Sequence, residues 1–325
     1  MNFSKKFSPG FLLTLICVVA MLVAACGNKG GAGTAQKAPT SQQHLRLAFI
    51  GGNGDGDITT FDPALASDAP SINAIQMVFT GLVQLDDHLN VQPQLAQSWT
   101  HTGTTWTFHL KPNLKFSDGT PLNASDVAYS INRALTPTIN NLSGGLASTY
   151  LGLIKDGIAF TSGAPGAPGT LIGDSIIVKD SNTLQLILDH NAGYFLDALA
   201  YPTSFVVEKS VVEKWGNTSW TDHLADNGGQ GGDGPFKVLN YNHNTGIKFA
   251  PNAAYYGLLP ALQEVDFNFY KTVETAYKAY QSNQVDWSSV PAELVPTQKF
   301  ALGDQYHQYP TLTIFYVAMN YLYKP

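Results

Sequence analysis

Asn53, Asp55 and Asp57 are spaced like the first ligands of a calcium-binding loop, in which side-chain oxygens at alternate positions bind the ion. An EF-hand loop also needs glycine at its sixth position and glutamate at its twelfth, where this chain has Ile58 and Ala64. A glycine-rich turn therefore explains this segment better than a calcium site.

The residues that could catalyse hydrolysis also lack the spacing of catalytic motifs. None of the eight histidines belongs to a His-x-x-x-His pair of the kind found in zinc proteases, and neither Gly-x-Ser-x-Gly nor Ser-x-x-Lys occurs after Ala25. Two of the 24 acidic residues could still meet in space as a glycosidase pair, so a lipid-anchored surface hydrolase acting on glycans remains an alternative. No motif demands catalysis, a metal or a cofactor.

Cys26 is the residue whose position predicts a covalent modification. Two lysines precede an apolar run of 15 residues at 11–25, which is shorter than the roughly 20 residues that a membrane-spanning helix needs. The run ends in Val23-Ala24-Ala25-Cys26, which resembles the lipobox of bacterial lipoproteins, where a diacylglyceryl group alkylates the cysteine thiol before cleavage. We therefore expect residues 1–25 to be a signal peptide and Cys26 to be lipidated.

The residues after Cys26 predict a flexible connection to the membrane. Residues 26–43 are rich in glycine and polar side chains and contain no large apolar residue, so they cannot bury enough surface to fold. We expect a lipid-anchored tether on the extracytoplasmic face of a bacterial membrane, at the cell surface or in the periplasm. Folding should begin near His44.

The composition after the signal excludes several classes of partner and site. All 24 acidic residues but only 16 of the 18 basic ones follow Ala25, so nucleic acid is not expected as a partner. The only cysteines are Cys17, inside the signal, and Cys26, which leaves no disulfide or thiolate metal site for the folded part.

Hydrophobic periodicity predicts an α/β protein. Residues 45–50 are predicted to form a buried strand, and apolar residues alternate in strands at 106–110, 184–188 and 265–269. Apolar residues recur at helical spacing over 71–82, 127–135 and 273–280. Asn123 or Ser125 can cap the second of these helices, and 161–170 is expected to be a surface loop. The third helix lies between the strand 265–269 and a short strand predicted at 285–287, which is the pattern of a right-handed parallel crossover.

Ligands of open α/β sheets bind beyond the carboxyl ends of the strands. Two segments meet that condition here: residues 51–69, which follow the first strand, and Trp287-Ser288-Ser289, which follow the last. The alternative interpretation is an ordinary polar loop with a core tryptophan, and spacing alone favours that alternative.

A series of motifs resembles the bacterial extracellular solute-binding proteins, family 5. The matching residues follow the order of the family and extend over most of 45–325: Thr60-Phe61-Asp62-Pro63-Ala64-Leu65-Ala66, 78–83, 91–99, 106–111, 115–122, 126–130, Gly234-Pro235-Phe236, 252–257 and Val285-Asp286. The resemblance implies a type II periplasmic-binding-protein-like fold, with two α/β lobes and an extra domain inserted in the first.

Mapped onto this chain, the resemblance implies a first lobe at 45–80 and 208–312 and an inserted domain at 81–207. The second lobe would begin at 313–325. Family members extend a few hundred residues further, so we expect a C-terminally truncated chain that lacks most of the second lobe.

The resemblance also implies a function: a receptor that captures short peptides and delivers them to the permease complex of an ABC transporter. Members for nickel, haem or sugars are the alternatives within the family. The ligand-binding positions that the resemblance implies are Ser67, Asp68, Ala69, Ser288, Ser289 and Tyr316. Trp287 joins them as a predicted ligand-binding residue because it follows the last strand. No enzymatic activity and no cofactor are implied, and the membrane lipid on Cys26 is the further expected partner.

Overall fold

The computed structural model describes residue 39 and residues 42–51 and 56–308. The signal peptide at 1–25, Cys26, the start of the second lobe at 313–325 and Tyr316 lie outside the described residues, as does nearly all of the tether. No helix within the described ranges is long and apolar enough to cross a membrane.

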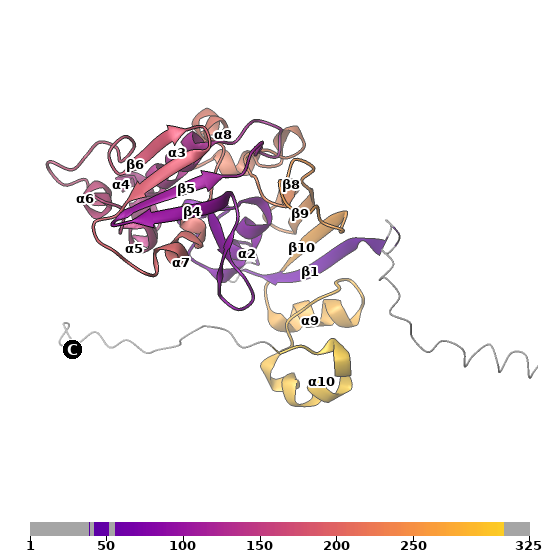
Figure 1. Cartoon of the computed structure of the whole chain (residues 1–325). Helices are drawn as coiled ribbons and strands as arrows, with labels where there is room; N and C mark the ends of the chain where they lie inside the picture. Colours follow the sequence, from indigo (N-terminus) through magenta and orange to yellow (C-terminus); the bar gives the residue numbers. More distant parts are fainter. Residues whose placement is uncertain (1–38, 40–41, 52–55, 309–325) are drawn as a thin grey trace, which may run out of the picture. The chain divides into compact units, whose positions relative to one another are not determined.

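The first sheet has the strand order β1-β10-β9-β8 (Figure 1). β1 (His44–Ile50) pairs in parallel with β10 (Glu264–Tyr270), which pairs antiparallel with β9 (Gly246–Pro251), and β9 with β8 (Phe236–Asn242). Residues of β1 alternate between two cores, as a period of two requires. Leu47 and Phe49 pack in the core that contains α2 (Ala69–Val78), whereas Ala48 packs with α9 (Val273–Gln281).

The second sheet is antiparallel and has its own core. Its order is β4-β5-β7-β6, formed by β4 (Ala96–Thr102), β5 (Thr105–Leu110), β7 (Thr183–Ile187) and β6 (Ile176–Asp180). The helix α3 (Ala124–Ala134) packs on β6 and β7. The remaining elements are the hairpin β2 (Val83–Leu85) and β3 (Val91–Pro93), and the helices α4 (Pro137–Leu142), α5 (Leu146–Leu151), α6 (Gly157–Ser162), α7 (Phe195–Leu199), α8 (Lys209–Trp215) and α10 (Val295–Ala301).

The α/β class and most of the predicted elements are confirmed. Asn123 caps α3 in a capping box with Asp126, and the apolar stripe of that helix, Val127, Ile131 and Ala134, is buried. The loop predicted at 161–170 begins later than expected, because α6 continues to Ser162.

The helix predicted over 71–82 was placed too far along the chain. Asp68 caps α2 by accepting from the Ser71 N–H at 2.9 Å, so the helix starts at Ala69. It ends at Val78 because side chains distant in sequence accept from the next backbone donors: Thr80 N–H donates to Asp233 at 2.9 Å and Gly81 N–H to Gln94 at 2.9 Å.

The prediction of a strand at 285–287 was wrong, because these residues form no regular strand. The chain returns alongside β1 after α9, as a parallel crossover does, but it forms only a single parallel bridge between Leu47 and Trp287. Since this side of β1 has no full neighbouring strand, β1 is only partly buried, although the sequence predicted a buried strand.

Candidate functional site

Trp287, Ser288 and Ser289 belong to the return segment, residues 285–289, which follows α9 and passes beside β1. They line one open pocket of about 1050 Å³ between α9, the return segment and α10. Figure 1 shows α9 beside β1 and α10 on the far side of α9. This pocket is the larger of the two described, and its volume is at the upper end of the range of small-molecule sites. The structure thus brings together the three ligand-binding residues predicted after the crossover.

Hydrogen bonds between tyrosines and glutamines connect the elements that line this pocket. The Tyr277 hydroxyl donates to Gln298 Oε1 at 2.8 Å, and the Tyr280 hydroxyl donates to Gln305 Oε1 at 2.9 Å. These bonds join α9 to α10 and to the turn that follows it. The indole of Trp287 is 52% exposed, so it offers an apolar face to a ligand rather than filling a core.

The pocket therefore combines an exposed aromatic ring with hydroxyl and amide groups. Ser289 is exposed and Ser288 is partly exposed, and their backbone and hydroxyl groups can donate and accept hydrogen bonds. A ligand with alternating donors and acceptors and an apolar part matches this chemistry.

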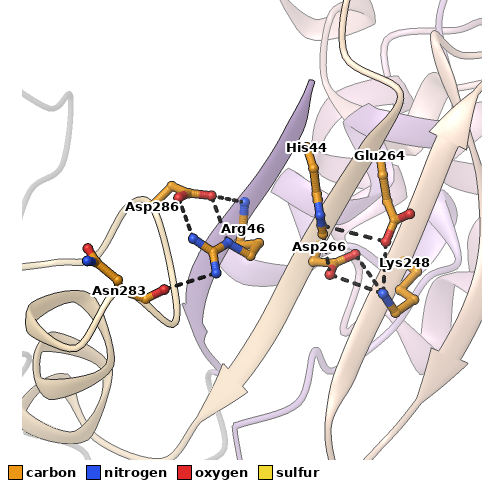
Figure 2. A network of polar contacts seen from close by, with 7 residues as sticks. All are labelled: His44, Arg46, Lys248, Glu264, Asp266, Asn283 and Asp286. Carbon is orange, nitrogen blue, oxygen red and sulfur yellow. Dashed lines mark hydrogen bonds and ion pairs between the residues drawn. The ribbon is translucent and has the colours of Figure 1, made fainter. Parts of the chain in front are cut away.

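An ion pair joins Arg46 of β1 to Asp286, the residue before Trp287 (Figure 2). Arg46 Nε and Nη2 donate to the two oxygens of Asp286 at 3.1 and 2.7 Å, and Nη1 donates to the Asn283 carbonyl at 3.0 Å. Hydrogen bonds from Arg46 hold the pKa of Asp286 below its usual range. Because Asp286 is adjacent to Trp287, the ion pair connects the pocket to β1.

Ser67, Asp68 and Ala69 lie elsewhere in the described structure. Ser67 lines a second pocket of about 490 Å³, and none of the three lines the pocket that contains Trp287. Both carboxylate oxygens of Asp68 are engaged by Ser71, one with its N–H and one with its hydroxyl, each at 2.9 Å. The prediction that these three residues bind the ligand stays a prediction.

A buried ion pair positions the segment that leads to Ser67. Asp62 is 2% exposed and accepts from the guanidinium of Arg133, from Trp220 Nε1 at 3.1 Å and from the Ala64 N–H at 3.0 Å. These donors satisfy the carboxylate, so a charge that is costly to bury is compensated. Asp62 belongs to the Asp62-Pro63 motif, but no local pattern identifies Arg133 as its partner.

Within the described ranges, one group of residues offers the ligand types of a metal site. His44, Glu264 and Asp266 each offer a ligand atom, and these atoms lie within 4.8 Å of one another on neighbouring strands. Figure 2 shows the Lys248 ammonium already between the carboxylates, at 2.8 Å from Glu264 and 3.2 Å from Asp266. A lysine cation thus compensates the charge of this group.

Sequence reasoning missed several of these contacts for a physical reason. Arg46 and Asp286 are 240 positions apart, and Asp62 and Arg133 are 71 apart, so no local pattern links them. Tyr277 and Tyr280 lie at helical spacing, which by itself predicts an apolar stripe. The hydroxyl group of a partly buried tyrosine usually forms a hydrogen bond, so the residue type itself indicates that each ring has a polar partner.

The fold is similar to that of solved binding proteins. The structure is similar to that of the Escherichia coli murein tripeptide binding protein MppA, with a TM-score of 0.69 and 26% identity over 79% of this chain and 48% of that one. The dipeptide-binding protein DppE of Bacillus subtilis is 28% identical over 269 residues, which are 82% of this chain and 46% of DppE. The periplasmic oligopeptide-binding protein OppA of Salmonella typhimurium is 27% identical over 310 residues, 93% of this chain and 54% of OppA.

Residues 90–325 match the family described as bacterial extracellular solute-binding proteins, family 5 middle. The chain belongs to this family, as the sequence motifs predicted. It spans about half the length of the curated relatives it matches.

Proposed function

We propose that this chain is part of the substrate-binding lipoprotein of an ABC transporter, which captures short peptides outside the membrane and delivers them to the permease. The observation that carries the proposal is the pocket lined by Trp287, Ser288 and Ser289, in a chain related to proteins named for binding dipeptides and oligopeptides.

The chemistry of the pocket favours a peptide backbone as the main feature recognised. Hydroxyl and amide groups can satisfy the N–H and C=O groups of an extended peptide, which are the same whatever its side chains are. The Trp287 ring can pack against an apolar side chain without selecting one type. We therefore expect weak selectivity for side chains, and weaker binding of sugars, of nickel and of haem.

Capture by lobe closure follows from the proposed division of the chain. In that division 45–80 and 208–312 form the first lobe, 81–207 the inserted domain and 313–325 the start of a second lobe. The first sheet and α9 fall in the first of these parts, and the second sheet falls in the inserted part. A ligand between two lobes excludes water and shifts the population toward a closed form, which the permease can distinguish from the open one.

Lipidation of Cys26 would hold this receptor at the outer side of the membrane. Several acyl chains, at roughly 0.8 kcal/mol per buried CH₂, anchor a protein that one chain would hold only transiently. The polar tether at 26–43 would then let the folded part move between the membrane surface and the transporter.

An NMR titration of the ¹⁵N-labelled chain with unrelated tripeptides tests the proposed function, because chemical shifts report weak binding as well as strong. We expect saturable shifts of the Trp287 indole and of the Ser288 and Ser289 amides, with similar Kd values for the different peptides. The controls are a disaccharide, Ni²⁺ and haem at matched concentration. Saturable shifts with one of these and none with the peptides would refute the peptide proposal.

A further inference from the structure

The return segment that carries Trp287 has little sheet structure to hold it in place. Beside β1 it forms one parallel bridge, made by Ala48 N–H donating to the Trp287 carbonyl at 2.9 Å and Trp287 N–H donating to the Arg46 carbonyl at 3.3 Å. Asp286 N–H also donates to the Arg46 carbonyl, at 2.7 Å. Beyond this bridge, Val285 is buried against α9, while Trp287 and Ser289 are exposed.

Arg46 supplies the further contacts that a full strand would have made. Its guanidinium reaches both oxygens of Asp286, and its own backbone N–H donates to Asp286 Oδ2 at 2.8 Å (Figure 2). The same guanidinium donates to the carbonyl of Asn283, the residue with φ of 58° at which the chain leaves α9. A planar fork that engages both carboxylate oxygens fixes orientation as well as distance.

We propose that Arg46 and Asp286 are positioning residues for the ligand pocket, because they fix the direction in which Trp287, Ser288 and Ser289 leave the edge of β1. The inference rests on the proposed function, since it assigns these two residues a role in peptide binding. Asp286 is among the residues that line the pocket, whereas Arg46 is not, so Arg46 exerts its effect without contact with the ligand. Arg46 acts through Asp286, and Asp286 acts through the backbone that it shares with Trp287.

A merely stabilising role does not fit the exposure of this pair. The Arg46 and Asp286 side chains are 34% and 37% exposed, so water and salt screen their attraction. Ion pairs with that exposure contribute little to global stability. Their local effect is larger, because the segment they hold has one bridge to β1 and is otherwise tied mainly through Val285.

The same face of the sheet offers a matched control. Lys248 on β9 forms ion pairs with Glu264 and Asp266 on β10 and is 52% exposed, and both of these partners lie outside the return segment. Replacing Lys248 with methionine removes a surface cation of the same sheet while leaving the hydrogen bonds between Arg46 and Asp286 in place.

The test compares Arg46→Met, Asp286→Asn, Arg46→Lys and Lys248→Met in the tripeptide titration, with thermal unfolding of each variant. We expect Arg46→Met and Asp286→Asn to raise the peptide Kd about tenfold, a difference of about 1.4 kcal/mol. Arg46→Lys should recover part of the affinity, since lysine keeps the charge without the fork. Lys248→Met should bind as the unaltered chain does, with a Tm similar to that of Arg46→Met.

Other results would overturn the inference in ways that separate it from the proposed function. An unchanged peptide Kd in Arg46→Met refutes the positioning role and leaves peptide binding intact. If the unaltered chain binds no peptide, the proposed function fails, and hydrogen exchange at 285–289 then decides the inference. Exchange that is faster in Arg46→Met but not in Lys248→Met supports positioning, and equal exchange in all variants overturns it.

Discussion

Replacing Asp233 with asparagine should remove a large dependence of stability on pH. Asp233 is fully buried and accepts from the N–H and the hydroxyl of Thr80, whose hydroxyl also meets Tyr256 Oη at 3.3 Å. None of the ion pairs found within 42–51 and 56–308 includes it. Burial raises the pKa of Asp233 from 3.8 to about 7, against the opposing effect of the Thr80 hydrogen bonds.

The size and sign of the effect follow from that difference in pKa. A carboxyl whose pKa is raised in the folded state contributes stability that is fully present below pH 3.8 and is lost as the pH rises through about 7. About three pKa units at 1.36 kcal/mol each correspond to about 4 kcal/mol in the free energy of unfolding. Asparagine has nearly the same shape and stays neutral throughout, so it does not incur this loss.

Urea unfolding at several pH values from 3.5 to 8 measures this change in the free energy of unfolding. Circular dichroism and tryptophan fluorescence monitor the unfolding. Relative to the unaltered chain, Asp233→Asn should gain about 4 kcal/mol across that range, with most of the gain between pH 4 and 7. Asp189→Asn, at an exposed position, serves as the control. A difference that stays constant with pH, or that changes in favour of aspartate as pH rises, would show that Asp233 ionises without cost and would refute the reasoning.

Three further predictions concern separate parts of the chain. Arg133→Met leaves the buried Asp62 carboxylate without its cation and should lower the free energy of unfolding by about 3–5 kcal/mol, whereas adding Asp62→Asn to it should recover part of that loss; urea unfolding of both variants checks this. Gly232→Ala would place a Cβ 2.3 Å from the Val78 carbonyl oxygen and should lower the Tm clearly. Gly193→Ala, whose Cβ would have no neighbour within 4 Å, should leave the Tm unchanged, and equal Tm values for the two variants would contradict the close approach at Gly232. Cys26→Ser, expressed in a bacterial host, should move the protein from the detergent phase to the aqueous phase and remove the lipid mass from its N-terminal peptide; a variant that stays as membrane-bound and as heavy as the parent would disprove lipidation.

The elements that the sequence predicted well are those whose periodicity agrees with their packing. The alternation of Val265, Phe267 and Phe269 gave β10, and the stripe through Val127 and Ile131 gave α3 with its Asn123 cap. In both, one face is apolar and one is polar, so local pattern and tertiary burial favour the same structure.

The errors arose where distant residues decide the local structure. The sequence around Val78 continues an apolar helical pattern, and the helix stops there because Asp233 and Gln94 accept from the following backbone N–H groups. Residues 285–287 have strand propensity, but only Trp287 forms a bridge to β1. Hydrogen bonds from Arg46 to Asp286 take the place of the other hydrogen bonds that a paired strand would form. Such partners cannot be identified from one sequence.

The candidate site was predictable only in part for the same reason. Its position after the crossover follows from the rule for ligands of α/β sheets, and Trp287, Ser288 and Ser289 do line a pocket. The walls that α9 and α10 contribute depend on hydrogen bonds such as that of Tyr277 with Gln298, 21 residues apart. Ser67, Asp68 and Ala69 await a test, and Tyr316 lies outside the described residues.

Photo-crosslinking tests most directly the claim that this chain binds short peptides beside Trp287. A tripeptide with a photoreactive side chain is irradiated with the chain, and the tryptic fragments are identified by mass spectrometry. The fragment 279–299 contains Trp287, and the fragment 47–115 contains Ser67, because trypsin does not cleave between Lys111 and Pro112. We predict an adduct on 279–299 that unlabelled peptides of unrelated sequence suppress and a disaccharide does not. An adduct that the disaccharide suppresses equally, or the absence of any adduct on 279–299, would contradict the account.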